Sequence, residues 1–208
     1  MNRTRVKICG LTRIRDVETA VDSGADAVGF VFVSGSPRCL SFETAVNLCR
    51  PVPAFIARVG LFLNPDVEFV RTALGRVPLN VLQFHGDENP AFCRQFGLPY
   101  IKAIRMQGEN PVASAECEFA DAAGILADSH EPGGQGGTGK QLDWQQVRPG
   151  SLPLILAGGL NAENVASAIA TVKPWAVDVS SGVETEPGVK SGSEIERFIR
   201  EAKSEHGS

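Results

Sequence analysis

The segment Leu154-Ile155-Leu156-Ala157-Gly158-Gly159-Leu160-Asn161 contains a complete strand-to-helix transition. Its uninterrupted apolar run is typical of a strand that is covered on both faces. A glycine pair follows and permits a tight turn, and Asn161 is an N-cap candidate for the helical stretch Ala162–Ala170. A strand, a turn and a helix in this order form one βα unit, and repeated βα units build a parallel sheet. The segment therefore predicts an α/β fold.

The same pattern recurs eight times along the 208 residues. Because no linker or shift in composition interrupts the repeats, we expect one domain over residues 1–208, folded as a compact (β/α)8 TIM barrel. A doubly wound open sheet is less favoured, because the first strand lacks the G-x-G-x-x-G turn of a dinucleotide site. The expected strands are Val6–Cys9, Ala27–Val33, Phe55–Leu63, Val81–Phe84, Tyr100–Ile104, Gly124–Asp128, Leu154–Ala157 and Trp175–Val179, and the clearest helices besides Ala162–Ala170 are Arg13–Ser23, Phe42–Cys49, Asp66–Leu74 and Ser193–Lys203.

The composition is that of an ordinary globular protein, with 43% hydrophobic and 21% charged residues. A chain of this length buries enough apolar surface to fold without disulfides or a structural metal. Its five cysteines are an odd number, and they show neither a C-x-x-C pair nor the Cys/His spacing of zinc ligands. We therefore expect no bound metal and a reducing, cytoplasmic location.

Charge and hydropathy argue against two classes of partner. The net charge is −4, and the lysines and arginines are scattered, which disfavours a nucleic acid bound through its phosphates. No apolar run approaches the ~20 residues of a membrane span, and the N-terminus shows no signal-peptide pattern. We expect a protein that binds neither nucleic acid nor membrane. A monomer is the default expectation, with a homodimer as the alternative.

Ionisable side chains stand at the carboxyl ends of several expected strands, where (β/α)8 enzymes build their active sites. Cys9 ends the first strand, His85 follows the fourth and Asp128 ends the sixth. Lys102 and Asp178 lie on the fifth and eighth strands. We expect these groups to converge at the mouth of the barrel. The structural alternatives are that Cys9 is a small buried hydrophobe and that Asp128 only caps a turn.

Two basic residues are expected to act near this mouth. Lys7 shares the strand face of Cys9, so its ammonium is expected to favour the thiolate. Arg38, in the loop after the second strand, offers a planar fork that suits a carboxylate, although a solvated surface arginine is an equal alternative. The loop Gly133–Gly139 beyond Asp128 either approaches a substrate or is a plain flexible loop.

Two turns after the seventh and eighth strands predict a phosphate site. Gly158 and Gly159 lead into a helix, and Ser180, Ser181 and Gly182 follow the last strand. In (β/α)8 enzymes the backbone N–H groups of these two loops cradle a phosphate. A phosphorylated small molecule is therefore the expected ligand, with two ordinary glycine turns as the alternative.

Six motifs follow one another along the chain: Lys7-Ile8-Cys9-Gly10-Leu11, Gly29-Phe30-Val31-Phe32 with Ser36-Pro37-Arg38, Gln83-Phe84-His85-Gly86, Gly136-Gly137-Thr138-Gly139 with Asp143-Trp144, Ala157-Gly158-Gly159-Leu160, and Asp178-Val179-Ser180-Ser181-Gly182-Val183-Glu184 with Pro187-Gly188-Val189-Lys190. Together they resemble phosphoribosylanthranilate isomerase of tryptophan biosynthesis, from the first strand to the last helix. The chain departs from that family at Phe84, where leucine is common, and at Ser191, where aspartate is frequent. Ser191 can cap the last helix as well as aspartate would.

The resemblance implies an aldose–ketose isomerase. N-(5-phosphoribosyl)anthranilate would be converted to 1-(2-carboxyphenylamino)-1-deoxyribulose 5-phosphate by an Amadori rearrangement that uses no cofactor. By its match to the family motifs, Asp128 would be the general acid and Cys9 the general base. Because an unperturbed Asp has a pKa of about 3.9 and an unperturbed Cys about 8.5, the environment must tune both groups.

The resemblance also assigns the binding residues. Arg38 would hold the anthranilate carboxylate, and Asp178 would lie near the sugar hydroxyls. His85 would line the site without being the base, and Lys7 belongs to the same set of substrate-binding residues. The phosphate would be bound by Gly158, Gly159, Ser180, Ser181 and Gly182.

Three other functions are weighed against this one. The related sugar isomerase of histidine biosynthesis performs the same chemistry on a ribotide with two phosphates, but its family calls for a carboxylate where this chain has Cys9. A barrel that forms indole-glycerol phosphate would need catalytic lysines and glutamates on early strands, which are missing here. A non-catalytic barrel that binds a phosphorylated ligand would have no use for an acid and a base together.

Overall fold

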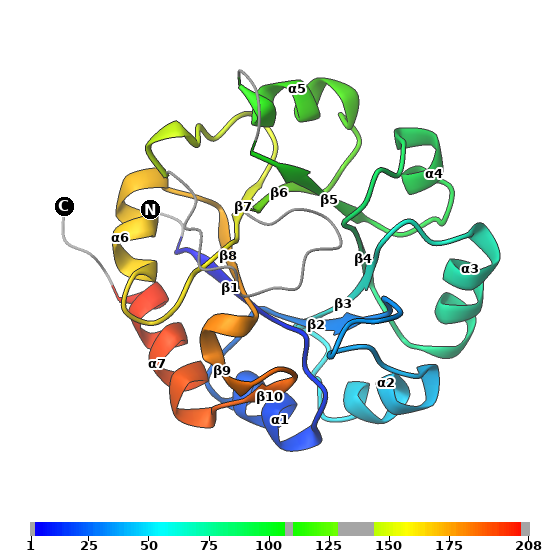
Figure 1. Ribbon diagram of the computed structural model, residues 1–208, viewed down its shortest axis with the longest axis horizontal. Helices are drawn as coiled ribbons and strands as arrows, with labels where there is room; N and C mark the ends of the chain where they lie inside the picture. Colours follow the sequence, from blue (N-terminus) through cyan, green and yellow to red (C-terminus); the bar gives the residue numbers. More distant parts are fainter. Residues whose placement is uncertain (1–2, 107–109, 129–143, 205–208) are drawn as a thin grey trace.

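The structure, a computed structural model, describes residues 3–106, 110–128 and 144–204. Within them eight parallel strands close into a barrel, in which each strand pairs with the next and β8 pairs with β1 (Figure 1). The predicted (β/α)8 barrel is confirmed, and the end of every expected strand is correct to within two residues. The strands are β1 (Arg5–Cys9), β2 (Ala27–Val31), β3 (Ala57–Phe62), β4 (Val81–Phe84), β5 (Tyr100–Arg105), β6 (Gly124–Asp128), β7 (Leu154–Leu156) and β8 (Ala176–Val179).

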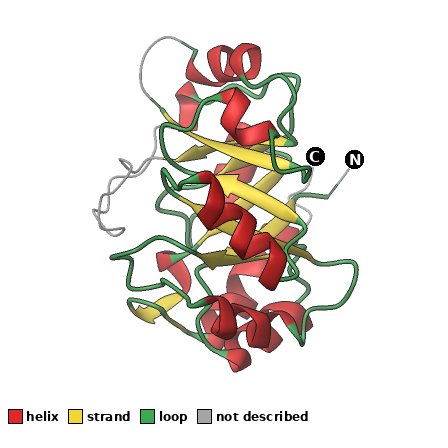
Figure 2. Cartoon of the chain, turned by 90° about the vertical axis from the view of Figure 1, so that its right-hand side faces the viewer, coloured by secondary structure: helices red, strands yellow, loops and turns green. Residues whose placement is uncertain are grey.

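Helices cover the outside of the barrel (Figures 1 and 2). Three of the expected helices begin at a side chain that accepts a backbone N–H of the first turn, namely Ser41, Asp66 and Ser191. Ser191 thus takes the capping role that was expected of it. The helices are α1 (Ile14–Asp22), α2 (Phe42–Cys49), α3 (Val67–Arg76), α4 (Pro90–Arg94), α5 (Pro111–Glu118), α6 (Val165–Val172) and α7 (Gly192–Lys203), with 3-10 turns η1 (Trp144–Gln146) and η2 (Ser181–Val183).

Three features differ from the sequence expectations. Helix α6 begins three residues late, because the Asn161 side chain accepts the N–H groups of Glu163 and Asn164 and forms a turn first. Helix α4 was not expected, since its five residues are too few to show a periodic pattern. The antiparallel pair β9 (Glu184–Glu186) and β10 (Val189–Lys190) was also missed. This hairpin lies at one end of the barrel (Figure 2).

Apolar side chains pack in two layers. A small cluster from β5 to β8 fills the barrel interior, and a larger one lies between the strands and the helices. Phe84 is fully buried in the outer layer and packs edge-on against Phe92, with ring centroids 5.6 Å apart. Burying one such side chain contributes roughly 1.5–3 kcal/mol. The strand ends that carry the candidate site are therefore held by packing on both faces.

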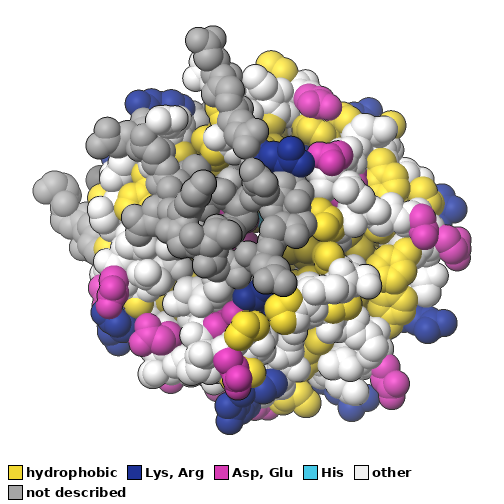
Figure 3. Space-filling model, viewed as in Figure 1, with side chains coloured by type: hydrophobic (Ala, Val, Ile, Leu, Met, Phe, Trp, Pro, Cys, Tyr) yellow, Lys and Arg dark blue, Asp and Glu magenta, His cyan; other side chains and the backbone are white. Residues whose placement is uncertain are grey.

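The end of the barrel seen in Figure 3 shows basic and acidic side chains interspersed around its periphery. This agrees with the scattered charges that the sequence predicts. Within the described part of the chain, no helix combines the length and the apolar character needed to cross a membrane.

Candidate active site

A cavity of about 460 Å³ opens at the carboxyl ends of the strands. It brings together ten of the twelve residues that the sequence singled out, and the other two, Lys7 and Lys102, are buried and do not line it. The expected convergence at the barrel mouth is thus observed for all of them except Lys7 and Lys102. The ten are Cys9, Arg38, His85, Asp128, Gly158, Gly159, Asp178, Ser180, Ser181 and Gly182.

The Cys9 thiol lies beside a buried ion pair. Lys7 Nζ donates to Asp178 Oδ1 at 2.9 Å, because the two residues are direct partners on the neighbouring strands β1 and β8. Burial raises the pKa of the Cys9 thiol, the Lys7 ammonium lowers it and the Asp178 carboxylate raises it again, with a result above the ordinary value. Lys7 therefore acts in the expected direction, but burial outweighs it. The resting thiol is protonated at neutral pH.

Asp128 lies on the other side of the cavity, next to His85. His85 Nε2 is 3.4 Å from Asp128 Oδ2, and His85 Nδ1 is 3.1 Å from the side-chain nitrogen of the fully buried Gln83. With the amide nitrogen donating to Nδ1, the neutral tautomer of the ring carries its proton on Nε2. In this tautomer the imidazole donates towards the Asp128 carboxylate.

Arg38 forms a two-bond ion pair at the rim of the cavity. Its Nε and Nη2 donate to the two carboxylate oxygens of Glu184 at 2.8 and 2.6 Å. The bond to Glu184 raises the pKa of Arg38. Although burial opposes it, the bonds from Arg38 and Lys190 hold the pKa of Glu184 below its ordinary value. Arg38 is thus a fixed guanidinium and not a free surface side chain.

The two turns after β7 and β8 meet at the same mouth. Gly158 and Gly159 have φ values of +83° and +69°, a region that side chains other than glycine rarely occupy. A side chain at Gly182 would collide with the backbone carbonyl of Leu160, so the second turn packs directly on the first. This close packing brings the backbone of both turns together at one edge of the cavity, which is the arrangement expected for a phosphate site.

An apolar wall, which the sequence interpretation missed, completes the cavity. It consists of Val31 and Val33 at the end of β2 and of Leu61 and Leu63 at the end of β3. Each pair is two residues apart, so both members point to the same side of the extended chain. This two-residue spacing of apolar side chains at the strand ends was the signal in the sequence that could have predicted the wall. The wall gives the cavity an apolar surface in addition to its polar groups.

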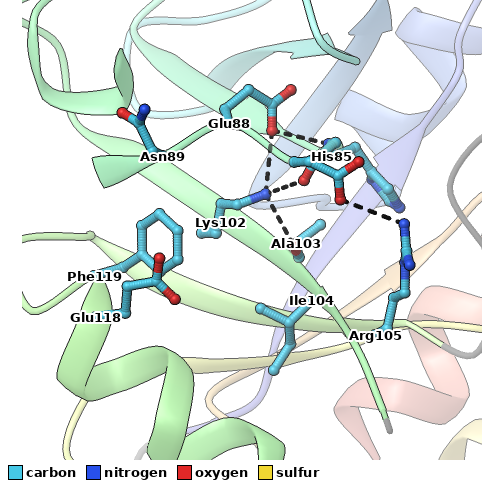
Figure 4. Close-up of a pocket in the computed structure, with 11 residues that line it drawn as sticks. His85, Glu88, Asn89, Lys102, Ala103, Ile104, Arg105, Glu118 and Phe119 are labelled. Carbon is cyan, nitrogen blue, oxygen red and sulfur yellow. Dashed lines mark hydrogen bonds and ion pairs between the residues drawn. The ribbon is translucent and has the colours of Figure 1, made fainter. Parts of the chain in front are cut away.

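The expectation that Lys102 joins this site is wrong. Its neighbours Ile101 and Ala103 fill the barrel interior, so Lys102 points outward between the strands and the helices. There Lys102 Nζ bonds Glu88 Oε2 at 3.1 Å beside a second cavity of about 360 Å³ (Figure 4). Glu88 also accepts the N–H of Gly86 at 2.9 Å. The pair therefore anchors the turn that follows His85.

Comparisons with known proteins agree along the whole chain. A family model described as N-(5'phosphoribosyl)anthranilate (PRA) isomerase matches residues 6–201. The N-(5'-phosphoribosyl)anthranilate isomerase of Thiobacillus denitrificans is 51% identical over 96% of this chain and 98% of its own length. The crystal structure of phosphoribosyl anthranilate isomerase from Thermotoga maritima is 42% identical and superposes with a TM-score of 0.88, over 96% of this chain and 98% of that one.

A second crystal structure of such an isomerase contains a ligand. It is described as a complex with reduced 1-(o-carboxyphenylamino)-1-deoxyribulose 5-phosphate. It is 39% identical to this chain, with a TM-score of 0.81, and covers 96% of this chain and 98% of the other.

Proposed function

The chain belongs to the N-(5'-phosphoribosyl)anthranilate isomerase family, and from this premise we propose that Cys9 and Asp128 are the base and the acid of its reaction. The protein is an isomerase of tryptophan biosynthesis that converts N-(5-phosphoribosyl)anthranilate to 1-(2-carboxyphenylamino)-1-deoxyribulose 5-phosphate. One observation carries the proposal: a thiol on β1 and a carboxyl group on β6 line one cavity. The family match and the relatives named as this isomerase favour its reaction over the histidine-pathway and non-catalytic alternatives.

Asp128 acts first. Its carboxyl group protonates the ring oxygen of the ribose, so the bond between that oxygen and C1′ breaks and the nitrogen lone pair forms an iminium ion. His85, which donates to the carboxylate left behind, stabilises its negative charge without acting as the base. The iminium ion acidifies the proton on C2′, and this proton is the target of the second group.

Cys9 then removes the C2′ proton as a thiolate, which gives an enolamine that tautomerises to the ketone. The raised pKa makes the thiolate scarce but also a strong base once it forms. We propose that Lys7 supports this step through its charge, because the ammonium lowers the pKa of the thiol against the effect of burial.

The remaining predicted residues bind the two ends of the substrate. Arg38 holds the anthranilate carboxylate through its guanidinium, and the apolar wall of β2 and β3 faces the aromatic ring. The backbone of Gly158 and Gly159 and that of Ser180–Gly182 bind the phosphate. Asp178 lies between these ends, beside the sugar hydroxyls. The ligand in the related crystal structure carries the same carboxylate and phosphate groups.

The test follows the loss of anthranilate fluorescence. The substrate is generated in place from anthranilate and phosphoribosyl pyrophosphate by the preceding enzyme, and the product is consumed by the following enzyme. Cys9→Ala and Asp128→Asn are compared with the wild type, and Cys117→Ala, which changes an exposed cysteine outside the cavity, is the matched control. A general acid or base contributes about 10²–10⁴-fold to the rate. We expect a loss of that size in the two site variants and none in the control.

The same assay has an outcome that overturns the assignment. If Cys9→Ala retains the wild-type kcat, the thiol is not the base, whatever the activity of the protein. The affinity of Cys9→Ala for the reduced product analogue, measured by calorimetry, distinguishes a catalytic role of Cys9 from a role in substrate binding. A base that contributes only to catalysis leaves this affinity unchanged in Cys9→Ala.

We propose a cytoplasmic location, because all five cysteines are free thiols and this state fits a reducing compartment. The expected monomer also stays a prediction, since one similar Thermotoga maritima structure is described as monomers generated from a dimeric isomerase. Sedimentation equilibrium at micromolar concentration distinguishes the two states. A mass twice that of the 22.1 kDa chain would contradict the monomer.

A further inference from the structure

Glu184 controls which part of the Arg38 guanidinium is available to a ligand. The two ion-pair bonds occupy Nε and Nη2, while Nη1 has no hydrogen-bond partner among the described residues. Both side chains are largely buried, with 12% of Arg38 and 5% of Glu184 exposed. A guanidinium held along one edge by a carboxylate keeps its planar orientation. A second carboxylate can then approach only the remaining edge.

Lys190 bonds the other side of the same carboxylate. Its fully buried Nζ donates to Glu184 Oε1 at 2.7 Å, to the Ser180 carbonyl oxygen at 3.0 Å and to the Ser180 hydroxyl at 3.3 Å. The pair of Arg38 and Glu184 alone is neutral and would attract an anion weakly. With Lys190 the group carries one net positive charge.

The hairpin that carries Glu184 and Lys190 is fixed to the segment after Cys9. Arg13 Nη2 donates to the Lys190 carbonyl at 2.6 Å, and the Lys190 N–H donates to the buried Asp16 carboxylate at 3.3 Å. The backbone of the hairpin is thus held without the Lys190 ammonium. Buried ion pairs are often no more stabilising than apolar groups of the same shape. The anchoring of the hairpin therefore gives no reason for two buried charges at these positions.

We propose that Glu184 and Lys190 are positioning residues that make Arg38 selective for the anthranilate carboxylate. Glu184 orients the guanidinium, and Lys190 keeps the group positively charged and joins it to Ser180 in the turn after β8. This inference rests on the proposed binding of the carboxylate by Arg38. Neither residue needs to touch the substrate.

The test compares two ligands that differ only in the carboxylate. One is reduced 1-(o-carboxyphenylamino)-1-deoxyribulose 5-phosphate, and the other is the same compound with an unsubstituted phenyl ring. Calorimetry gives a Kd for each, and their ratio measures the preference for the carboxylate. The variants are Glu184→Gln and Lys190→Met, with Glu186→Gln as the control because Glu186 is exposed on the same hairpin.

We expect the ratio to fall about 10-fold or more in Glu184→Gln and in Lys190→Met, the size of a lost charge-assisted hydrogen bond. The control should keep the wild-type ratio. Lys190→Met can also weaken both ligands through Ser180, but a common loss cancels in the ratio. Glu184→Gln preserves volume, so it remains informative if Lys190→Met fails to fold.

Arg38→Met separates the failure of this inference from the failure of the proposed function. If Arg38→Met loses the preference while Glu184→Gln and Lys190→Met retain it, Arg38 binds the carboxylate unaided and the inference is wrong. If Arg38→Met itself keeps the preference, the proposed role of Arg38 fails first. If Glu184→Gln weakens the affinity for both ligands equally, Glu184 has only a structural role.

Discussion

Replacing Lys7 by methionine should make the Cys9 thiol harder to ionise. Side chains two residues apart on a strand face are about 6.6 Å apart, and at an effective dielectric constant of about 20 a unit charge at that distance contributes about 2.5 kcal/mol. This corresponds to a change of about 60-fold in the ionisation equilibrium. Because burial already raises the pKa of Cys9, the loss of the ammonium moves the thiolate further from neutral pH.

The assay is the rate of alkylation by iodoacetamide as a function of pH. The exposed Cys39 and Cys117 are first changed to serine. The other buried cysteines, Cys49 and Cys93, interfere little, because they are packed in the core whereas Cys9 lines the cavity. In this background the rate at pH 7 should fall about 60-fold in Lys7→Met, and kcat at pH 7 should fall with it.

A second variant controls for the buried carboxylate that loses its partner. In Lys7→Met the Asp178 charge remains beside Cys9 and also raises its pKa, whereas Lys7→Met with Asp178→Asn removes both charges. The alkylation profile of the double variant should return part of the way to that of the wild type. The reasoning is refuted if Lys7→Met folds and its alkylation profile coincides with the wild-type profile, because Lys7 would then exert no field at the thiol.

Three further predictions concern stability and phosphate binding. Phe84→Ala should lower the free energy of unfolding by about 3–5 kcal/mol in urea, whereas Phe55→Ala, at a fully exposed position, should change it by less than about 0.5 kcal/mol; equal losses would contradict the assigned core. Gly182→Ala forces the turn away from the Leu160 carbonyl, so KM should rise more than kcat falls, and an unchanged KM would argue against a phosphate site there. Although burial opposes it, the ion pair with Arg3 and a backbone hydrogen bond lower the pKa of Asp26. The ionised Asp26 therefore stabilises the fold above pH ~4, and this stabilisation is lost as the pH falls through the lowered pKa. Asp26→Asn should flatten the acid side of the curve of Tm against pH, and parallel curves for variant and wild type would refute this.

The residues that the sequence placed correctly share one property. Cys9, Asp128 and the turn at Gly158 stand at the ends of apolar runs, and in a barrel of parallel strands all such ends meet at one mouth. Topology alone therefore brought them together. Lys102 shows the limit of the argument, because β5 is apolar on both faces and its pattern does not reveal which residues point inward.

The hairpin was beyond prediction for a different reason. Glu184 and Lys190 lie on strands of three and two residues, and strands so short show no alternation. Their importance comes from contacts with Arg38, 146 residues away in the chain. A long-range ion pair has no signature in the local sequence. The sequence alone was therefore equally compatible with Arg38 as a solvated surface residue, and only the structure shows that Glu184 fixes it.

The raised pKa of Cys9 follows from the charges around it. The substrate brings a carboxylate and a phosphate, so a base that carried a permanent negative charge would repel both ends while the substrate binds. A carboxylate in place of Cys9 would be ionised at neutral pH, whereas the buried thiol is neutral most of the time and releases its proton before the thiolate takes the C2′ proton. Lys7 then stabilises the thiolate as it forms. A high pKa leaves only a small population of thiolate, but a base of high pKa removes the C2′ proton with a larger driving force.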